Sequence, residues 1–115
     1  RQQEAAAGCG RMNEIVVLAG ADSDMLRKYA ELDEYSAELA DRFEHDLQDA
    51  FDLISRHPRI GAAYQYPPFR KWSLQGWKMA IFYQPSGSRC FIHAVIDMRQ
   101  SPDSIRALLQ ARTHP

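Results

Sequence analysis

One hundred and fifteen residues, 45% hydrophobic and 25% charged, are expected to form one domain around one hydrophobic core, which excludes a multidomain enzyme. Six glycines and six prolines exclude a collagen-like or broadly disordered chain, and the longest apolar run is far shorter than the roughly 20 residues that cross a bilayer. The formal net charge of −1 argues against a generally basic nucleic-acid-binding protein, and two cysteines are too few for a disulfide framework, so a reducing cytoplasm is the expected location.

The charge is unevenly distributed along the chain. Residues 1–54 hold 5 basic and 13 acidic side chains, a balance of −8, whereas residues 55–115 hold 9 basic and 2 acidic side chains, a balance of +7. An acidic half beside a basic half is compatible with a basic face that meets an anionic partner, either nucleic acid or an acidic protein. It is equally compatible with helices whose solvated faces simply carry Asp and Glu.

The beginning of the chain divides into a tail and a strand. Residues 1–11 have no apolar periodicity and precede Met12, which would serve as a natural start. We therefore predict a disordered tail or a vector-derived segment there, and a single domain over residues 12–115. The β-branched run Glu14–Ala19 ends at Gly20 and predicts a strand that is buried on both faces.

Two helices are expected next, as an antiparallel hairpin. The first has N-cap oxygens in Asp22 and Ser23 and extends to about Asp33. The second begins after the N-cap Ser36 and ends before Pro58, which cannot continue a helix. Its apolar stripe has a 3.6-residue period and needs a sheet to cover it. The stripe consists of Leu39, Phe43, Leu47, Ala50, Phe51 and Ile54.

Residues 59–68 are predicted as a loop, because Gly61 and the Pro67-Pro68 pair break regular structure. Three strands follow, and turn residues separate them. The predicted strands cover residues 69–74, 77–83 and 89–96. Strict alternation places one set of side chains of the last strand on a single face. This set is Cys90, Ile92, Ala94 and Ile96.

A final helix begins with Ser101 as its N-cap and Pro102 at its first position. The element order is therefore βααβββα. It predicts an α+β domain in which a helical hairpin and a C-terminal helix pack on a mostly antiparallel sheet of about four strands. The sequence contains no Walker loop, GxGxxG, HExxH or CxxC motif, which excludes the nucleotide-binding and zinc-binding classes.

This order and the residues that punctuate it resemble the RelE/ParE superfamily of toxins from type II toxin-antitoxin and plasmid-stabilisation systems. The resemblance covers nearly the whole chain after residue 12. It rests on the helix stop followed by Pro and Gly in Ile54–Gly61, Arg70 at a strand start, the aromatic strand end Ile81–Tyr83, and the run His93–Pro102. It implies a RelE/ParE-like fold, a cognate antitoxin that covers the toxin in a hetero-oligomer, and no cofactor or metal.

The resemblance implies one of two activities. RelE-like members are ribosome-dependent ribonucleases that cut mRNA, whereas ParE-like members inhibit DNA gyrase without an obvious catalytic site. A metal-independent endoribonuclease would draw on Arg70, Lys71 and Arg99 as cations, on His93 as acid or base, and on Tyr83 as a stacking or proton-donating group. RelE-like nucleases have a functional Tyr or His near the chain end, where this chain has an extra helix, which favours the ParE-like branch. A degenerate, non-toxic domain that only binds the antitoxin is the third alternative.

Three cations are predicted to bind the target. Arg70 and Lys71 at a strand start and Arg99 after the last strand are expected to converge on one basic edge of the sheet. The alternative is that Arg70 or Arg99 pairs with Asp97 or a helix acid and stabilises the fold. His93 lies in mid-strand, where a packed histidine is more common than a catalyst. The antitoxin is expected to neutralise the basic edge and cover apolar sheet surface by strand addition or by a helix in a groove, through residues that the sequence does not assign.

Overall fold

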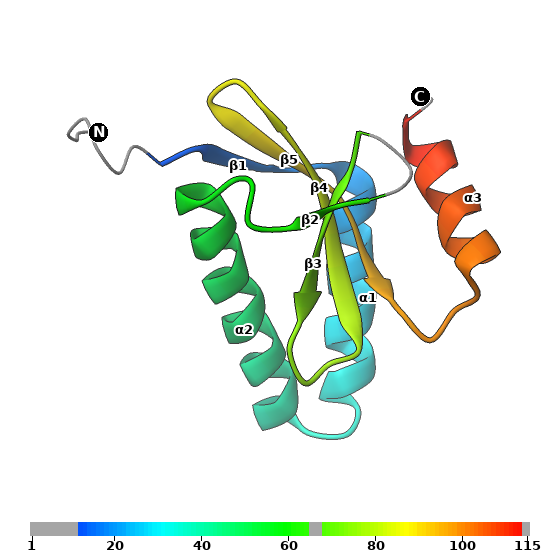
Figure 1. The fold of residues 1–115 in the computed structure, drawn as a ribbon. Helices are drawn as coiled ribbons and strands as arrows, with labels where there is room; N and C mark the ends of the chain where they lie inside the picture. Colours follow the sequence, from blue (N-terminus) through cyan, green and yellow to red (C-terminus); the bar gives the residue numbers. More distant parts are fainter. Residues whose placement is uncertain (1–11, 65–67, 114–115) are drawn as a thin grey trace.

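The structure, a computed structural model, describes residues 12–64 and 68–113, so the predicted tail over residues 1–11 and the loop breaker Pro67 lie outside the described residues. The described chain contains three helices and five strands (Figure 1). In chain order these are β1 (Glu14–Val17), α1 (Ala19–Asp33), α2 (Ala37–Arg56), β2 (Ala62–Ala63), β3 (Arg70–Leu74), β4 (Met79–Ser86), β5 (Arg89–Asp97) and α3 (Pro102–Thr113).

The five strands form one mixed sheet in the order β1-β5-β4-β3-β2. Strand β1 is parallel to β5, and the other neighbours are antiparallel. The predicted α+β class with a mostly antiparallel sheet is therefore confirmed. The sheet has one strand more than predicted, because Ala62 and Ala63 in the predicted loop pair with Lys71 and Arg70.

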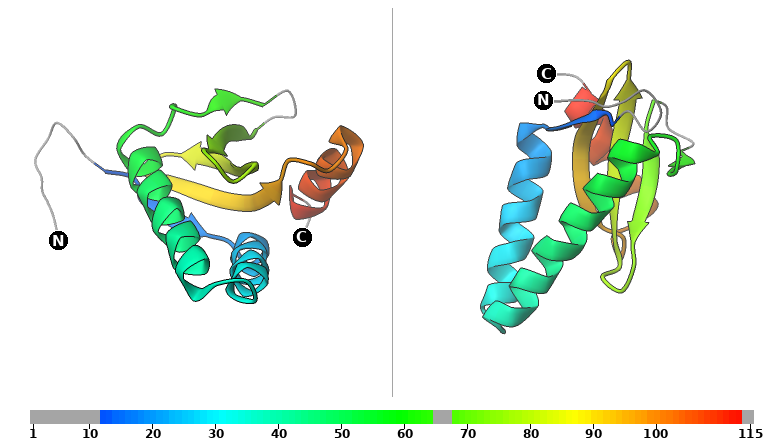
Figure 2. Two further views of the ribbon diagram at one scale, coloured as in Figure 1. Left: turned by 90° about the horizontal axis from the view of Figure 1, so that it is seen from below. Right: turned by 90° about the vertical axis from the view of Figure 1, so that its left-hand side faces the viewer.

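Two hydrophobic cores lie on opposite faces of the sheet. The larger core lies between the sheet and the α1–α2 hairpin, and contains the apolar stripe of α2, with Leu39 partly buried at its margin. From β4 it takes Met79, Ile81 and Tyr83. The smaller core lies under α3, on the other face of the sheet (Figure 2). It consists of Phe69, Ala80, Phe82, Ala94, Ile96, Ile105 and Leu109. Alternate residues of β4 therefore face opposite cores.

A β-bulge in β5 corrects the predicted alternation of that strand. Tyr83 pairs with Ile92 and Phe82 pairs with Ala94, so His93 is an extra residue without a partner on β4. Cys90 and Ile92 therefore belong to the larger core, whereas Ala94 and Ile96 belong to the smaller one. The prediction that these four side chains share one face was wrong, because one inserted residue reverses the faces after it.

Helix α1 begins earlier than predicted. Leu18 is the N-cap in an extended conformation and makes no side-chain capping bond, so the prediction of Asp22 and Ser23 as N-caps was wrong. The strand ends at Val17, and the Leu18 carbonyl already accepts the N–H of Asp22 at 2.9 Å. Asp22 instead lies in the first helical turn, where its negative charge complements the helix dipole.

The other predicted helix caps are confirmed. The Ser36 hydroxyl accepts the N–H of Leu39 at 3.2 Å, and α2 ends before Pro58. The Ser101 hydroxyl likewise accepts the N–H of Ser104 at 3.1 Å. None of the helices in the described part of the chain has the length and apolar character needed to cross a membrane.

The turn between β4 and β5 is shorter than predicted. Strand β4 continues through Pro85, which faces Cys90, and ends at Ser86. The tight turn then uses Gly87, whose φ of 61° falls in the left-handed region that favours glycine. The hairpin therefore projects beyond the rest of the sheet (Figure 1).

Candidate functional site

Tyr83 and Arg70 fasten the loop between α2 and β2 to the sheet. The Tyr83 hydroxyl donates its proton to the Pro58 carbonyl at 2.8 Å and accepts the Gly61 N–H at 2.9 Å. Arg70 Nη1 donates to the Gly61 carbonyl at 2.6 Å and to the Arg59 carbonyl at 3.3 Å. Tyr83 is fully buried, and this burial raises the pKa of its phenol. Both side chains are therefore engaged in holding the loop.

Gly61 is required by the closeness of this contact. A Cβ atom at that position would lie 2.8 Å from the Tyr83 hydroxyl oxygen and 2.9 Å from the Lys71 carbonyl oxygen. Both distances are shorter than a carbon atom tolerates, and the second neighbour is backbone that cannot move aside. Gly61 therefore allows the loop after α2 to pack closely against β3 and β4.

Arg99 is bound to the carboxylate two residues before it. Its backbone N–H and its Nε both donate to Asp97 Oδ1 at 2.9 Å, and Nη2 contacts Asp97 Oδ2. The hydrogen bond from the Arg99 side chain lowers the pKa of Asp97 to about 2. This pair closes the turn after β5, although the Arg99 side chain is largely exposed.

The structure does not bring the three predicted target-binding cations together. Arg70 faces Tyr83 across the β3–β4 ladder, whereas Arg99 lies beyond Asp97, which faces Met79 at the other end of β4. With about 3.3 Å for each residue of a strand, Arg70 and Arg99 lie at opposite ends of the sheet. The expected convergence of Arg99 with Arg70 does not occur, and the role of each in target binding stays a prediction.

Other cations lie beside Arg70 and Lys71 instead. Lys71 pairs with Ala62, and Arg70 contacts the backbone of Arg59 in the loop that follows Arg56. No Asp or Glu occurs between Asp52 and Asp97 in the sequence, and none of these four cations forms an ion pair within the described residues. We call this group of cations at the β2–β3 side of the sheet the basic edge, with Arg70 on the hairpin face of β3 and Lys71 on the opposite face. It consists of Arg56, Arg59, Arg70 and Lys71.

His93 occupies the bulge on the face of the sheet that carries α3. Its Nε2 lies 3.2 Å from Gln84 Oε1, its ring packs edge-on against Phe69, and its Nδ1 is buried without a hydrogen-bond partner in the described structure. Burial lowers the pKa of the imidazole, and the positive charge of Arg112 lowers it further. His93 is therefore held as a neutral ring that faces away from Tyr83.

The five candidate ribonuclease residues are consequently dispersed. Tyr83 and Arg70 share the hairpin face of the sheet. Lys71 faces Phe82, which belongs with His93 to the opposite face. Arg99 is beyond the end of β5. In the described structure these residues do not surround one common point.

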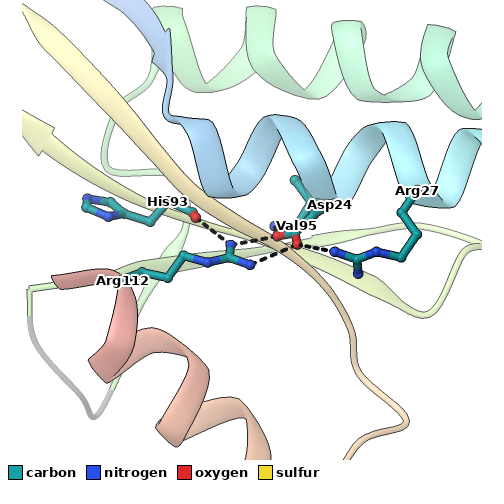
Figure 3. A network of polar contacts seen from close by, with 5 residues as sticks. All are labelled: Asp24, Arg27, His93, Val95 and Arg112. Atoms are coloured by element: carbon teal, nitrogen blue, oxygen red, sulfur yellow. Dashed lines mark hydrogen bonds and ion pairs between the residues drawn. The ribbon is translucent and has the colours of Figure 1, made fainter. Parts of the chain in front are cut away.

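A buried ion pair between α1 and α3 is the feature that sequence reasoning missed (Figure 3). Arg112 donates from Nη1 and Nη2 to the two carboxylate oxygens of Asp24 at 2.7 and 2.9 Å. Asp24 is 6% exposed and also accepts the N–H of Val95 at 3.0 Å. Arg112 Nη1 further donates to the carbonyl of His93 at 2.9 Å. We call these contacts the Asp24 network; it binds both helices to the bulge in β5.

A cavity of about 380 Å³ lies between α1, the end of β5 and α3. Its charged lining residues pair with one another, so it presents no unpaired charge to a ligand. These pairs are Arg27 with Asp24, Lys28 with Glu31, and Arg99 with Asp97.

One side-chain group in the described residues has the composition of a metal-ligand set. His45, Asp46 and Asp49 of α2 place their ligand atoms within 4.8 Å of one another. Asp46 also accepts the indole N–H of Trp77 at 2.9 Å, and His45 lies 3.5 Å from the Asp49 carboxylate. These contacts explain why the three polar side chains lie together on the surface of α2.

Comparisons with known proteins identify the fold. Neither models of protein families nor curated proteins match the sequence. Among solved structures, a chain of the chromosomal ParDE TA system from P. aeruginosa superimposes with a TM-score of 0.65 and 17% sequence identity. The similarity covers 74% of this chain and 95% of that chain. The protein therefore has the RelE/ParE-like α+β fold that the sequence resemblance implied.

Proposed function

We propose that this chain is the toxin of a type II toxin-antitoxin module of the plasmid-stabilisation kind, that it inhibits DNA gyrase as ParE-like toxins do, and that a cognate antitoxin neutralises it. The fold shared with a chain of a ParDE system supports the toxin assignment. The C-terminal helix α3, which covers the smaller core, supports the ParE-like branch.

The observation that carries the choice of target is the dispersal of the candidate ribonuclease residues. Cleavage of RNA without a metal needs an acid, a base and cations around one phosphate. The only proton of the Tyr83 hydroxyl is donated to Pro58, and Arg70 donates to Gly61. His93 lies on the opposite face. This arrangement favours a protein that acts by binding over one that acts by catalysis.

The basic edge is the surface that we propose for the anionic partners of the toxin. Lys71 makes no side-chain hydrogen bond or ion pair within the described residues, and Arg59 is exposed. Strand β2 borders this surface and is an edge strand with both residues exposed. An extended segment of the antitoxin with acidic side chains can add to β2 and cover these cations.

Two measurements test the proposed target. The chain is induced from a repressed promoter without antitoxin, and the incorporation of labelled amino acids and of labelled thymidine is followed over the first minutes. We expect DNA synthesis to fail while protein synthesis continues. Purified chain is then expected to inhibit supercoiling of relaxed plasmid by DNA gyrase. An immediate collapse of protein synthesis would replace this proposal with the ribosome-dependent ribonuclease, and no effect at all would indicate the degenerate antitoxin-binding domain.

A charge-reversed pair tests the proposed surface. Arg59→Glu combined with Lys71→Glu is expected to reduce inhibition of gyrase about tenfold or more, because charge reversal opposes an anionic partner. The matched control reverses Arg106, an exposed residue of α3 whose ion pair with Asp103 lies outside the basic edge. Equal inhibition by the two variants would show that the basic edge does not bind the target.

A further inference from the structure

The two helices of the hairpin diverge from their connecting turn and leave an open V between them (Figure 2). A groove of about 490 Å³ lies along this V. We call it the hairpin groove. Its lining residues are Asp22, Met25, Leu26, Tyr29, Phe43, Glu44, Leu47 and Gln48.

The floor of the hairpin groove is apolar and its wall exposes a large hydrophobic side chain. Phe43 and Leu47 form the buried floor, and Met25 is half-buried beside them. Leu26 is 64% exposed, although it lies next to this apolar surface. Leu26 and Met25 line the same groove as Phe43 and Leu47, so these side chains form contiguous apolar surface of the kind that a partner covers.

The charged residues that line the groove are all negative. Asp22 and Glu44 line it, and neither carboxylate makes an ion pair within the described residues. Tyr29 donates to Asp41 at 2.8 Å and so places a third carboxylate beside them. The groove lining includes no Lys or Arg. Residues 19–56 as a whole hold 11 acidic and 4 basic side chains, so the surrounding potential has the same sign.

We propose that the hairpin groove binds a short amphipathic helix of another protein, with an apolar face flanked by Lys or Arg. The lining residues of α1 recur at three- and four-residue spacing over about two turns, and those of α2 lie at i, i+1, i+4 and i+5 over about one and a half turns. Two such rows form the kind of groove that receives the side-chain ridges of a third helix. The basic flanks would meet Asp22 and Glu44.

This surface is separate from the basic edge. The groove contacts α2 between Phe43 and Gln48, whereas the basic edge begins at Arg56, eight residues after Gln48 and about 12 Å along the helix. The inference therefore does not depend on the proposed gyrase inhibition. A toxin that binds an acidic antitoxin at one surface has a second surface of opposite charge for a basic partner.

The test uses the full chain and a fluorescein-labelled peptide of about 15 residues, roughly four helical turns. Leu recurs in the peptide at i, i+4, i+7 and i+11, and Lys flanks the leucines. One control peptide scrambles the leucine spacing, and a second replaces Lys with Glu. Fluorescence anisotropy measures binding. We expect saturable binding of the amphipathic basic peptide alone, weakened by added salt. Equal binding of the acidic or the scrambled peptide, or no binding of the basic one, would overturn the proposal.

Variants of exposed residues locate the binding site. Asp22→Lys with Glu44→Lys, and separately Leu26→Asp, are each expected to raise the dissociation constant about tenfold or more. The control, Glu38→Lys with Asp52→Lys, reverses one first-turn carboxylate and one carboxylate near the C-terminal end of α2, both outside the groove. Thermal unfolding verifies that each variant is folded. Equal loss of affinity in the control pair would overturn the assignment to this groove.

A second copy of the chain is the competing occupant. Sedimentation equilibrium without peptide is expected to give a monomer for both the natural sequence and Leu26→Asp. A dimer that Leu26→Asp dissociates would mean that the groove binds another copy of this chain, and the proposal of a basic helical partner would be wrong.

Discussion

At the scale of single residues, Asp24 has the greatest structural consequence. Its carboxylate is buried and is satisfied by two donors of Arg112 and by the N–H of Val95. Arg112 also donates to the carbonyl of His93, the bulge residue that has no pairing partner on β4. A buried charge of this kind is costly once a partner is lost, because no water replaces the missing donor.

Removal of Arg112 is expected to destabilise the fold strongly. Arg112→Ala removes the two closest charged donors of the buried Asp24 carboxylate, which keeps the Val95 N–H and the Arg27 contact at 3.5 Å, and should lower the free energy of unfolding by about 3 kcal/mol. Arg106→Ala removes an exposed pair with Asp103 and should cost less than about 0.5 kcal/mol. Urea unfolding of both variants gives the comparison, and a double-mutant cycle with Asp24→Asn isolates the pair. Equal costs for the two arginines would contradict a stabilising role of the network.

Gly20 gives a second prediction about the same network. Ala is usually favoured over Gly inside a helix by about 0.5–1 kcal/mol. A Cβ atom at Gly20, however, would lie 2.6 Å from Arg112 Nε, and that side chain is fixed by its bonds to Asp24. Gly20→Ala is therefore expected to lower the free energy of unfolding by about 1–2 kcal/mol, the order of a charged hydrogen bond.

The control for Gly20→Ala combines it with Arg112→Ala. In that background the methyl group has no arginine to displace, so the same substitution should become neutral or stabilising. Destabilisation of equal size in both backgrounds would show that the arginine is not the cause.

His93 predicts a pH dependence of stability. Its folded-state pKa is lower than the ordinary value of 6.5, so the unfolded chain binds more protons than the folded one as the pH falls below 6.5. The free energy of unfolding should therefore decrease on acidification through this range and level off below the folded pKa. His93→Gln should flatten the decrease, with exposed His57→Gln as its matched control. The measurements stay above about pH 5, where Asp97, with a pKa of about 2, remains ionised.

At the scale of elements, the irregular parts of the sheet decide how the loops are attached. The bulge in β5 places His93 on the face of the sheet that carries α3, and Arg112 of that helix donates to the His93 carbonyl. The two-residue strand β2 and the Tyr83 hydroxyl hold the loop after α2, and through it the backbone of the basic edge. The regular helices and strands bury the apolar side chains of the two cores. The bulge in β5 and the short strand β2 position the polar contacts that attach α3 and the loop after α2.

Tyr83→Phe tests the attachment of this loop. The substitution keeps the ring in the larger core but removes the partner of the buried Gly61 N–H and the donor to Pro58. An unpaired buried group costs about 1–3 kcal/mol, so we expect a loss of that size in urea unfolding. Tyr29→Phe, which removes a surface hydrogen bond to Asp41, is the matched control and should cost less. A smaller effect for Tyr83→Phe than for the control would disprove the attachment.

At the scale of the whole molecule, one sheet serves two hydrophobic cores. Strands β4 and β5 contribute side chains to the core under α3 and to the core under the hairpin. The acidic helices and the basic edge thus belong to one cooperative unit, with surfaces of opposite sign.

Cooperative unfolding follows from the shared sheet. Leu109→Ala in the smaller core and Leu47→Ala in the larger core should each cost about 2–5 kcal/mol. Trp72 and Trp77 both pack against the larger core, so their fluorescence should report Leu109→Ala at the same urea midpoint as circular dichroism. Separate midpoints for the two signals would show that the α3 core unfolds independently.

The sequence by itself determined the elements that depend on neighbours along the chain. The stripe of α2, its cap at Ser36 and its end before Pro58 were predictable, because a 3.6-residue period and a capping bond involve residues within one or two turns. The same holds for the start of α3 at Ser101. The order of these elements carried the resemblance from which the RelE/ParE-like fold followed.

Only the tertiary structure determined which polar and charged side chains lie together. The pairing of Asp24 with Arg112 joins residues far apart in the sequence, and no local pattern marks either of them. The bulge at His93 exchanged the faces of β5, and the strand register separated Arg99 from Arg70. Register and long-range ion pairs are set by the packing of whole elements, because a shift of one residue moves every later side chain to the other face.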